Sequence, residues 1–110
     1  MTTIHNDDWQ NAQEMAHDNL NIIPPPIESL NLLQKKDKVV ICNGYERFKV
    51  RVAHIFDSPD KHSTDWNILG IVENDLVCYA SYSKGSLVQF MGKNIHKIIL
   101  SEKIDLNIGR

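Results

Sequence analysis

Charged and apolar side chains alternate along Arg47-Phe-Lys-Val-Arg-Val-Ala-His-Ile-Phe56, the most regular pattern in this chain of 110 residues. Successive side chains of a β-strand point to opposite faces, so the pattern predicts a strand with one face in a core. The residues expected to face that core are Phe48, Val50 and Val52, with His54 and Phe56 added if the alternation continues. The residues expected to form a basic row on the opposite face are Arg47, Lys49 and Arg51.

Short apolar segments of similar length surround this strand. Further strands are expected at 38–42, 66–72, 76–80, 87–91 and 94–100, the last after a short turn. Asn43-Gly44 between the first two strands predicts a tight hairpin, because both residues adopt the left-handed backbone of such turns. Five or six short antiparallel strands at close spacing predict a small SH3-like or split β-barrel over residues 38–100.

The N-terminal third has a different pattern. Residues 6–20 are expected to form a helix, capped by Asn6 or Asp7, with an apolar stripe through Trp9, Ala12, Ala16 and Leu20. Pro24-Pro25-Pro26 excludes a regular helix and predicts a stiff strap over residues 22–36. The whole chain, residues 1–110, is therefore expected to form one domain of the α+β class, mainly β, with an N-terminal helix.

Residues 101–110 end the sequence with Ile104, Leu106 and Ile108 at alternate positions. The alternation favours a tail strand that completes the sheet. A frayed tail and a strand added to a partner's sheet edge are the alternatives.

Composition excludes several classes of protein. The net charge of −2 gives no global basic field that would attract nucleic acid. The first residues lack the basic and apolar regions of a secretory signal, and every apolar run is too short to span a bilayer. A cytoplasmic protein with no membrane contact is therefore expected, in which Cys42 and Cys78, both inside apolar runs, are buried free thiols.

Sequence motifs give no support to catalysis. The five histidines are scattered, and neither H-E-x-x-H nor C-x-x-C spacing is present. Neither a G-x-S-x-G elbow nor a phosphate-binding glycine loop occurs. We therefore expect no catalytic residue, no metal and no cofactor, and a protein that is not an enzyme.

Two surfaces are candidates for binding. Carboxylates cluster in two neighbouring loops and could dock a basic protein partner, with two tyrosines as anchoring contacts. These candidate partner-binding residues are Asp57, Asp60, Asp65, Glu73, Asp75, Tyr79 and Tyr82. The alternative is a phosphate-binding face formed by the basic row at positions 47, 49 and 51.

The order of several short motifs resembles a family of small bacterial domains, the YegJ-like group, and related toxin-immunity proteins. Leu33-Gln-Lys-Lys-Asp-Lys-Val-Val-Ile41 is similar to the family's L-x-x-G-D-x-V-x-L segment, with Lys36 where the family has glycine. Glu46-Arg-Phe-Lys-Val50 is similar to its E-R-[MF]-W-V strand, and Gly70-Ile-Val-Glu-Asn-Asp75 to its G-x-[LV]-D-N-D turn. Lys84-Gly-Ser-Leu-Val-Gln-Phe90 is similar to its K-x-G-D-x-I-x-F segment.

This resemblance implies an SH3-like or split-barrel sheet with an N-terminal helix, no established enzyme activity, and a link to toxin neutralisation. Together with the absence of catalytic motifs, it favours a non-enzymatic domain that masks a protein partner, such as a cognate toxin, in the manner of an immunity protein. The alternative is a small-barrel nucleic-acid-binding protein that uses the basic face of the strand at 47–51.

Overall fold

The computed structural model describes residues 3–18, 23–44, 46–56, 63–76 and 83–99. Six strands and two short α-helices lie in this part of the chain. The strands are β1 (Ile4–Asn6), β2 (Lys38–Cys42), β3 (Arg47–Ile55), β4 (Asn67–Val72), β5 (Leu87–Met91) and β6 (Ile95–Ile99). The α-helices are α1 (Ala12–Asp18) and α2 (Ile27–Leu30), and a 3-10 turn, η1 (Gly92–Asn94), joins β5 to β6.

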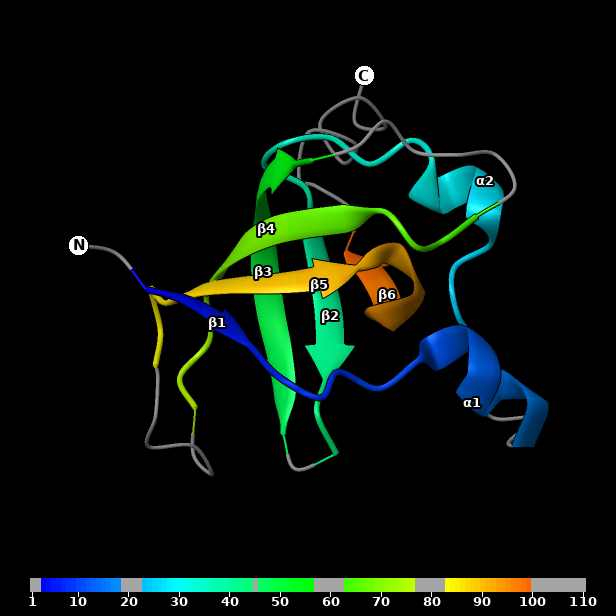
Figure 1. Cartoon of the computed structure of the whole chain (residues 1–110), viewed down its shortest axis with the longest axis horizontal. Coiled ribbons are helices and arrows are strands. Elements are labelled where there is room, and N and C mark those ends of the chain that lie inside the picture. The colour runs from blue at the N-terminus through cyan, green and yellow to red at the C-terminus, as the bar shows by residue number, and fades with distance from the viewer. Residues whose placement is uncertain (1–2, 19–22, 45, 57–62, 77–82, 100–110) are drawn as a thin grey trace, which may run out of the picture.

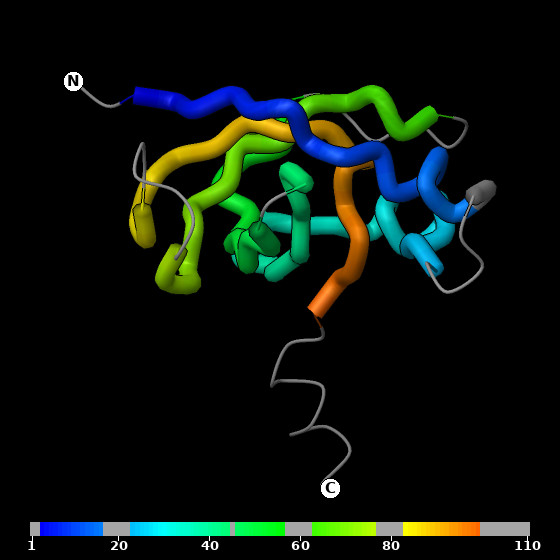
Figure 2. Tube along the Cα trace, turned by 90° about the horizontal axis from the view of Figure 1, so that it is seen from below, coloured from blue at the N-terminus to red at the C-terminus, as the bar shows by residue number. Residues whose placement is uncertain are grey.

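All six strands form one mixed sheet in the order β1-β5-β4-β3-β2-β6. Figure 1 shows β1, β4 and β5 running across β2 and β3, and Figure 2 shows the bent sheet with both helices at one end. The α+β, mainly-β prediction is confirmed. The expectation of antiparallel strands throughout is wrong for one pair, because β1 runs parallel to β5.

Among the described strands, β1 and β6 are the two edges and are not paired with each other. The described sheet is therefore not a closed barrel, and the SH3-like or split-barrel form stays a prediction. The predicted strand at 76–80 falls largely on residues 77–82, which lie outside the described residues, as does the tail at 101–110.

The core is formed on one face of the sheet. Alternate residues of β3 and β4 are fully buried there, as the alternation around Phe48 predicts. Leu30 of α2 and Leu33 just after it close the core from the strap side. Trp66 is also buried and donates its indole N–H to the Ser63 carbonyl over 3.1 Å.

The second half of β3 departs from the predicted pattern. Val52 is opposite Gly70 and His54 is opposite Leu69, so Ala53 is an extra residue, a β-bulge. A bulge reverses which face each following side chain takes. Ile55 therefore packs against the core, and the prediction that His54 and Phe56 face inward with Phe48 is wrong.

The N-terminal segment differs from its prediction as well. Residues 4–6 form a strand, and the helix begins at Ala12 rather than at residue 6. The Trp9 indole N–H donates to the Gln89 carbonyl over 2.7 Å, and its ring meets Phe48 edge-on at 5.1 Å. The side-chain amide of buried Asn94 donates to the Trp9 carbonyl over 3.2 Å. These contacts hold the segment along the sheet, a tertiary effect that local sequence does not encode.

The described part of the strap, residues 23–36, combines extended backbone with the short helix α2. Pro26 has φ −68° and ψ 157°, the polyproline region, before α2 begins at Ile27. Lys36 at the end of the strap has φ 79°, in the left-handed region that favours glycine. Its N–H donates to the Val52 carbonyl over 2.8 Å, which fixes this backbone against β3.

Replacing Lys36 by Gly should raise the free energy of unfolding by about 0.5–1 kcal/mol. The left-handed conformation costs a side-chain-bearing residue about 1–2 kcal/mol, and the greater freedom of glycine in the unfolded chain offsets part of the gain. Urea unfolding measures the change. Lys35→Gly, one residue earlier at negative φ, is the matched control and should be destabilising. Equal effects of the two variants would contradict this account.

Candidate functional site

The basic row on β3 is partly neutralised by a carboxylate that directly follows the neighbouring strand β4. Arg51 Nε lies 3.0 Å from Glu73 Oε2, and Lys38 Nζ lies 3.2 Å from Glu73 Oε1. Arg47 and Lys49 remain exposed on the same face. One of the three predicted phosphate-binding residues is therefore already bound to an acidic partner, which weakens the row as an anion site.

The same contacts set the charge of Glu73. Burial alone would raise the pKa of Glu73, but hydrogen bonds and charge from Lys38 and Arg51 outweigh burial and lower it below its ordinary value of 4.5. A lowered pKa in the folded state stabilises the fold above the unfolded-state pKa, and this stabilisation is lost as pH falls through the lowered value.

Replacing Glu73 by Gln should lower the free energy of unfolding by about 1 kcal/mol at pH 7, since it removes two partly exposed ion pairs. The difference from the wild type should begin to shrink as pH falls through about 4.5, where the unfolded-state carboxylate becomes protonated, and should approach zero below the lowered pKa of Glu73 in the folded state. Urea unfolding at pH 7 and pH 3 checks both points. Glu28→Gln, an exposed carboxylate in α2, is the control. A pH-independent difference for Glu73→Gln would contradict the ion-pair explanation.

The structure does not bring the described members of the predicted acidic surface together. Asp65 precedes β4 and pairs with Lys93 over 3.2 Å, whereas Glu73 follows β4 at its other end. A strand of this length separates them by roughly 20 Å. Asp75 is exposed beside Glu73. The remaining predicted residues lie outside the described residues: Asp57, Asp60, Tyr79 and Tyr82.

Asn74 has a structural role in the turn that follows β4. Its side-chain oxygen accepts the Lys49 N–H over 2.8 Å, and its side-chain amide donates to the Arg47 carbonyl over 3.2 Å. These two bonds continue the pairing of β3 beyond the end of β4. The Asn74-Asp75 pair is thus explained by turn and strand structure, in line with the behaviour of Asn at turns.

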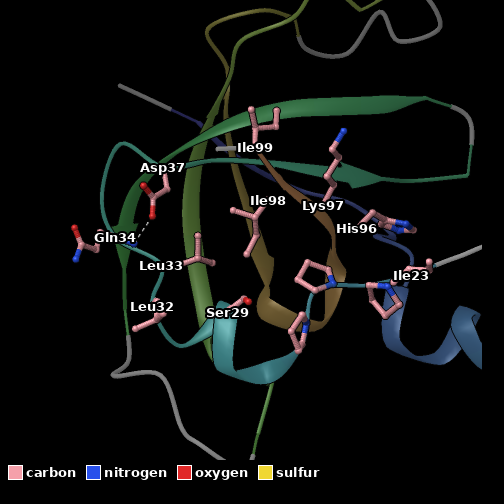
Figure 3. Close-up of a pocket in the computed structure, with 13 residues that line it drawn as sticks. Ile23, Ser29, Leu32, Leu33, Gln34, Asp37, His96, Lys97, Ile98 and Ile99 are labelled. Carbon is pink, nitrogen blue, oxygen red and sulfur yellow. Dashed lines mark hydrogen bonds between the residues drawn. The ribbon is translucent and has the colours of Figure 1, made fainter. Parts of the chain in front are cut away.

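A groove of about 700 Å³ lies between the strap and β6. Pro24–Pro26 and Leu32–Leu33 form one wall, and residues 96–99 of β6 form the other (Figure 3). Ile23 and Leu32 at this groove are 84% and 75% exposed, high values for large apolar side chains. The predicted binding surfaces did not include this groove.

One wall of the groove is a strand edge. Among the described strands, β6 pairs with β2 alone. The other edge of β6 presents backbone N–H and C=O groups that a further strand can bond. Figure 3 shows Ile98 pointing towards the strap, while Lys97 and Ile99 point the other way. The groove therefore combines an apolar surface with an edge of β6 that no described strand pairs with.

His96 adds a polar group to this wall. Burial lowers the pKa of His96 below its ordinary value of 6.5, and the charge of Arg47 acts in the same direction, whereas a hydrogen bond with the Gln10 backbone raises it. The net effect favours a neutral imidazole at neutral pH. Its Nε2 atom is buried and has no hydrogen-bond partner within the part of the chain that the structure describes.

The described residues contain few groups suited to covalent or metal chemistry. Cys42 is a buried free thiol, as predicted, and burial raises its pKa while Arg47 opposes the rise. A raised thiol pKa means little reactive thiolate at neutral pH. Within the described ranges, no group of three or more His, Cys, Asp or Glu side chains could hold a metal ion. No helix in those ranges has the length and apolar character needed to cross a membrane.

Comparison of the sequence and the structure with protein-family models, curated proteins and solved structures found no match. The YegJ-like resemblance of the sequence motifs therefore stays a prediction.

The groove could have been suspected from two features of the sequence. Leu32 and Leu33 are adjacent, so a turn that buries one exposes the other, and Leu33 is the buried member. Ile23 stands directly before three prolines that cannot donate backbone hydrogen bonds. What the sequence could not indicate is that β6 would lie opposite the strap, because that proximity depends on the whole sheet.

Proposed function

We propose that this chain is a non-enzymatic protein-binding domain, and that its groove receives an extended apolar segment of a partner protein. The observation that carries the proposal is an edge of β6 that is unpaired within the described chain, next to the exposed side chains of Ile23 and Leu32. Single exposed apolar residues are common, but here they adjoin a groove and unpaired strand backbone. An added strand satisfies both, since it bonds to the edge and places alternate side chains against the prolines.

The proposal extends to the role of the domain. Masking a protein partner, such as a cognate toxin, requires a complementary surface of about 800 Å² per partner, which a chain of 110 residues can supply. The motif resemblance to immunity proteins supports this role. So does the left-handed backbone of Lys36, where the family pattern has glycine. We include a cytoplasmic location and a small SH3-like or split-barrel form in the same proposal.

The acidic surface remains a secondary part of the proposal. Exposed Asp75 could contact a basic rim of the partner, although Asp65 and Glu73 already have cationic partners. Rim charges chiefly affect the rate of association. Nucleic-acid binding is the weaker alternative, because Glu73 binds Arg51 and so reduces the charge of the basic row.

Co-expression with the product of a neighbouring gene tests the proposal. The wild-type chain should restore growth if that product is toxic, and should bind the purified product directly. Leu32→Asp should weaken binding at least about tenfold, because it places a charge in the apolar wall without disturbing a buried residue. Phe56→Asp is the matched control, since Phe56 is also exposed but does not line the groove, and it should bind like the wild type. Equal loss in both variants, or binding with Leu32→Asp unimpaired, would argue against the groove as the binding site.

A further inference from the structure

We propose that the partner protein is acidic where it lies beside the groove, and that its carboxylates bind the outward side chains of β6, β2 and β3, which we call the cationic face. This inference rests on the proposed function, because it names the chemistry of the same partner. It also differs from the expectation of a basic partner that the acidic loops of the sequence suggested.

Strand register brings cations from three strands to one face of the sheet. Residues that are directly paired on neighbouring strands point to the same face. Val40 of β2 pairs with Lys97 of β6 and with Lys49 of β3. In the next row, Lys38 pairs with Arg51. With the alternate residue of β3 added, the cationic face carries five basic residues: Lys38, Arg47, Lys49, Arg51 and Lys97.

A single described carboxylate forms ion pairs with this face. Glu73 pairs with Lys38 and Arg51, at 3.2 and 3.0 Å. The other three cations are exposed, and they take part in no ion pair with a described residue: Arg47, Lys49 and Lys97. The whole chain has a net charge of −2, so this face is a local excess of positive charge that attracts an acidic surface.

The spacing of the three exposed cations suits a regular element of a protein. Lys97 and Lys49 lie two strands apart, with roughly 10 Å between their Cα atoms, and Arg47 lies roughly 7 Å along the strand from Lys49. Glutamates one and two turns apart on a helix, or at alternate residues of a strand, have similar separations. One acidic helix or strand of the partner can therefore contact all three cations.

The side chains between these cations favour a protein over nucleic acid. Val40 lies half-buried between Lys49 and Lys97, and Ile99 lies half-buried beside Lys38. Aliphatic groups of this kind suit a protein surface, whereas bases are bound largely by stacking on aromatic rings. A phosphate backbone, charged at every nucleotide, would also pass close to Glu73. A protein can place its carboxylates on the exposed cations alone.

The cationic face is continuous with the groove. Lys97 and Ile99 belong to this face and also line the groove, while Ile98 between them points towards the strap (Figure 3). A single strand, β6, therefore separates the two surfaces. A partner whose apolar segment lies in the groove can reach the cations across that strand.

Nuclear magnetic resonance titration of the full-length chain tests the inference without the natural partner. The probe is a short synthetic peptide that alternates Val and Glu, used at about 50 mM salt, where exposed charges are weakly screened. It should shift amide signals of β2, β3 and β6, and bind at least about tenfold more tightly than the same peptide with Lys in place of Glu. Lys49→Gln/Lys97→Gln should weaken its binding at least about fivefold. Lys84→Glu, an exposed site in the turn before β5, changes the net charge by the same amount and is the matched control, which should bind like the wild type.

The outcomes separate this inference from the proposed function. Equal binding of the two peptides would overturn the acidic preference, and if Leu32→Asp then weakened both peptides, the groove would still stand as the binding site. Equal losses in Lys49→Gln/Lys97→Gln and Lys84→Glu would show an effect of net charge alone and would overturn the assignment to this face. A single-stranded oligonucleotide that binds more tightly than the Val-Glu peptide, and that loses affinity in Lys49→Gln/Lys97→Gln, would overturn the inference in favour of nucleic acid. Binding of neither peptide would count against both proposals.

Discussion

Phe48→Ala should lower the free energy of unfolding by about 3–5 kcal/mol, the range for truncation of a fully buried Phe. The Phe48 side chain is 0% exposed and lies in the core between strands and strap. Its ring also receives Trp9 edge-on at 5.1 Å, so truncation removes one of the contacts that hold the N-terminal segment. Urea or guanidinium unfolding, monitored by far-UV circular dichroism, measures the loss.

Phe56→Ala is the matched control, because the sequence alone predicts Phe48 and Phe56 on the same face. Phe56 is 48% exposed after the bulge, and its described ring contact is with His54 at 5.0 Å. Its truncation should therefore cost about 1 kcal/mol or less. Similar losses for the two variants would mean that β3 runs without a bulge and that Phe56 faces the core.

Phe48→Ala could leave too little stability to measure, since small domains have only about 5–15 kcal/mol in total. Phe48→Leu keeps most of the buried volume and should cost about 1–2 kcal/mol. A cost below that of Phe56→Ala would contradict the assigned burial.

This pair of phenylalanines also shows how far the sequence could predict the sheet. Alternation of side chains identifies β3 because burial of one face forces a period of two. It cannot locate the bulge, since Ala53 is small and fits either face. The bulge is instead determined by the pairing of β3 with β4, where Gly70 is opposite Val52. A single strand read alone carries no information on its partner.

The wrong prediction of a helix that begins at residue 6 has a similar cause. Residues 4–6 contain too few side chains to show a period, and their strand exists because it pairs with β5, more than eighty residues later. The asparagine and aspartate that suggest a helix cap are also common in irregular segments, and the helix begins six residues after Asn6. Parallel pairing with a distant strand lies beyond any local pattern.

The candidate sites were predictable to different degrees. The basic row on β3 was predicted as a face, but its partial neutralisation by Glu73 depends on register across two strands. The groove was not predicted because its walls are nearly seventy residues apart in the chain. The alternation of Ile104, Leu106 and Ile108 is visible in the sequence, but these residues lie outside the described part of the chain.

Gly70→Ala is the second substitution expected to have a large effect, at about 3 kcal/mol of lost stability, the upper part of the usual range for overpacking. A Cβ atom at Gly70 would collide with Val50 Cγ1 and come within 3.0 Å of Phe90 Cε1 and 3.3 Å of the Arg51 carbonyl oxygen. Val50 is a fully buried, β-branched side chain, so it has little freedom to move aside. Gly85→Ala is the control: Gly85 has φ 94° with nothing within 4 Å of an added Cβ, so only backbone strain of about 1 kcal/mol is expected.

A double-mutant cycle separates the collision with Val50 from other causes. Val50→Ala alone should cost about 2 kcal/mol, because it leaves a cavity in the core. In the double variant the added methyl group of residue 70 occupies part of that cavity. The stability lost by the double variant should therefore be smaller, by at least about 1 kcal/mol, than the sum of the losses of the two single variants. Strict additivity would mean that the β4 backbone moves away from β3 when a Cβ is added. In that event the glycine would be required by strand pairing at the bulge and not by the packing of Val50, and the effect of Gly70→Ala would respond instead to removal of the extra residue at position 53.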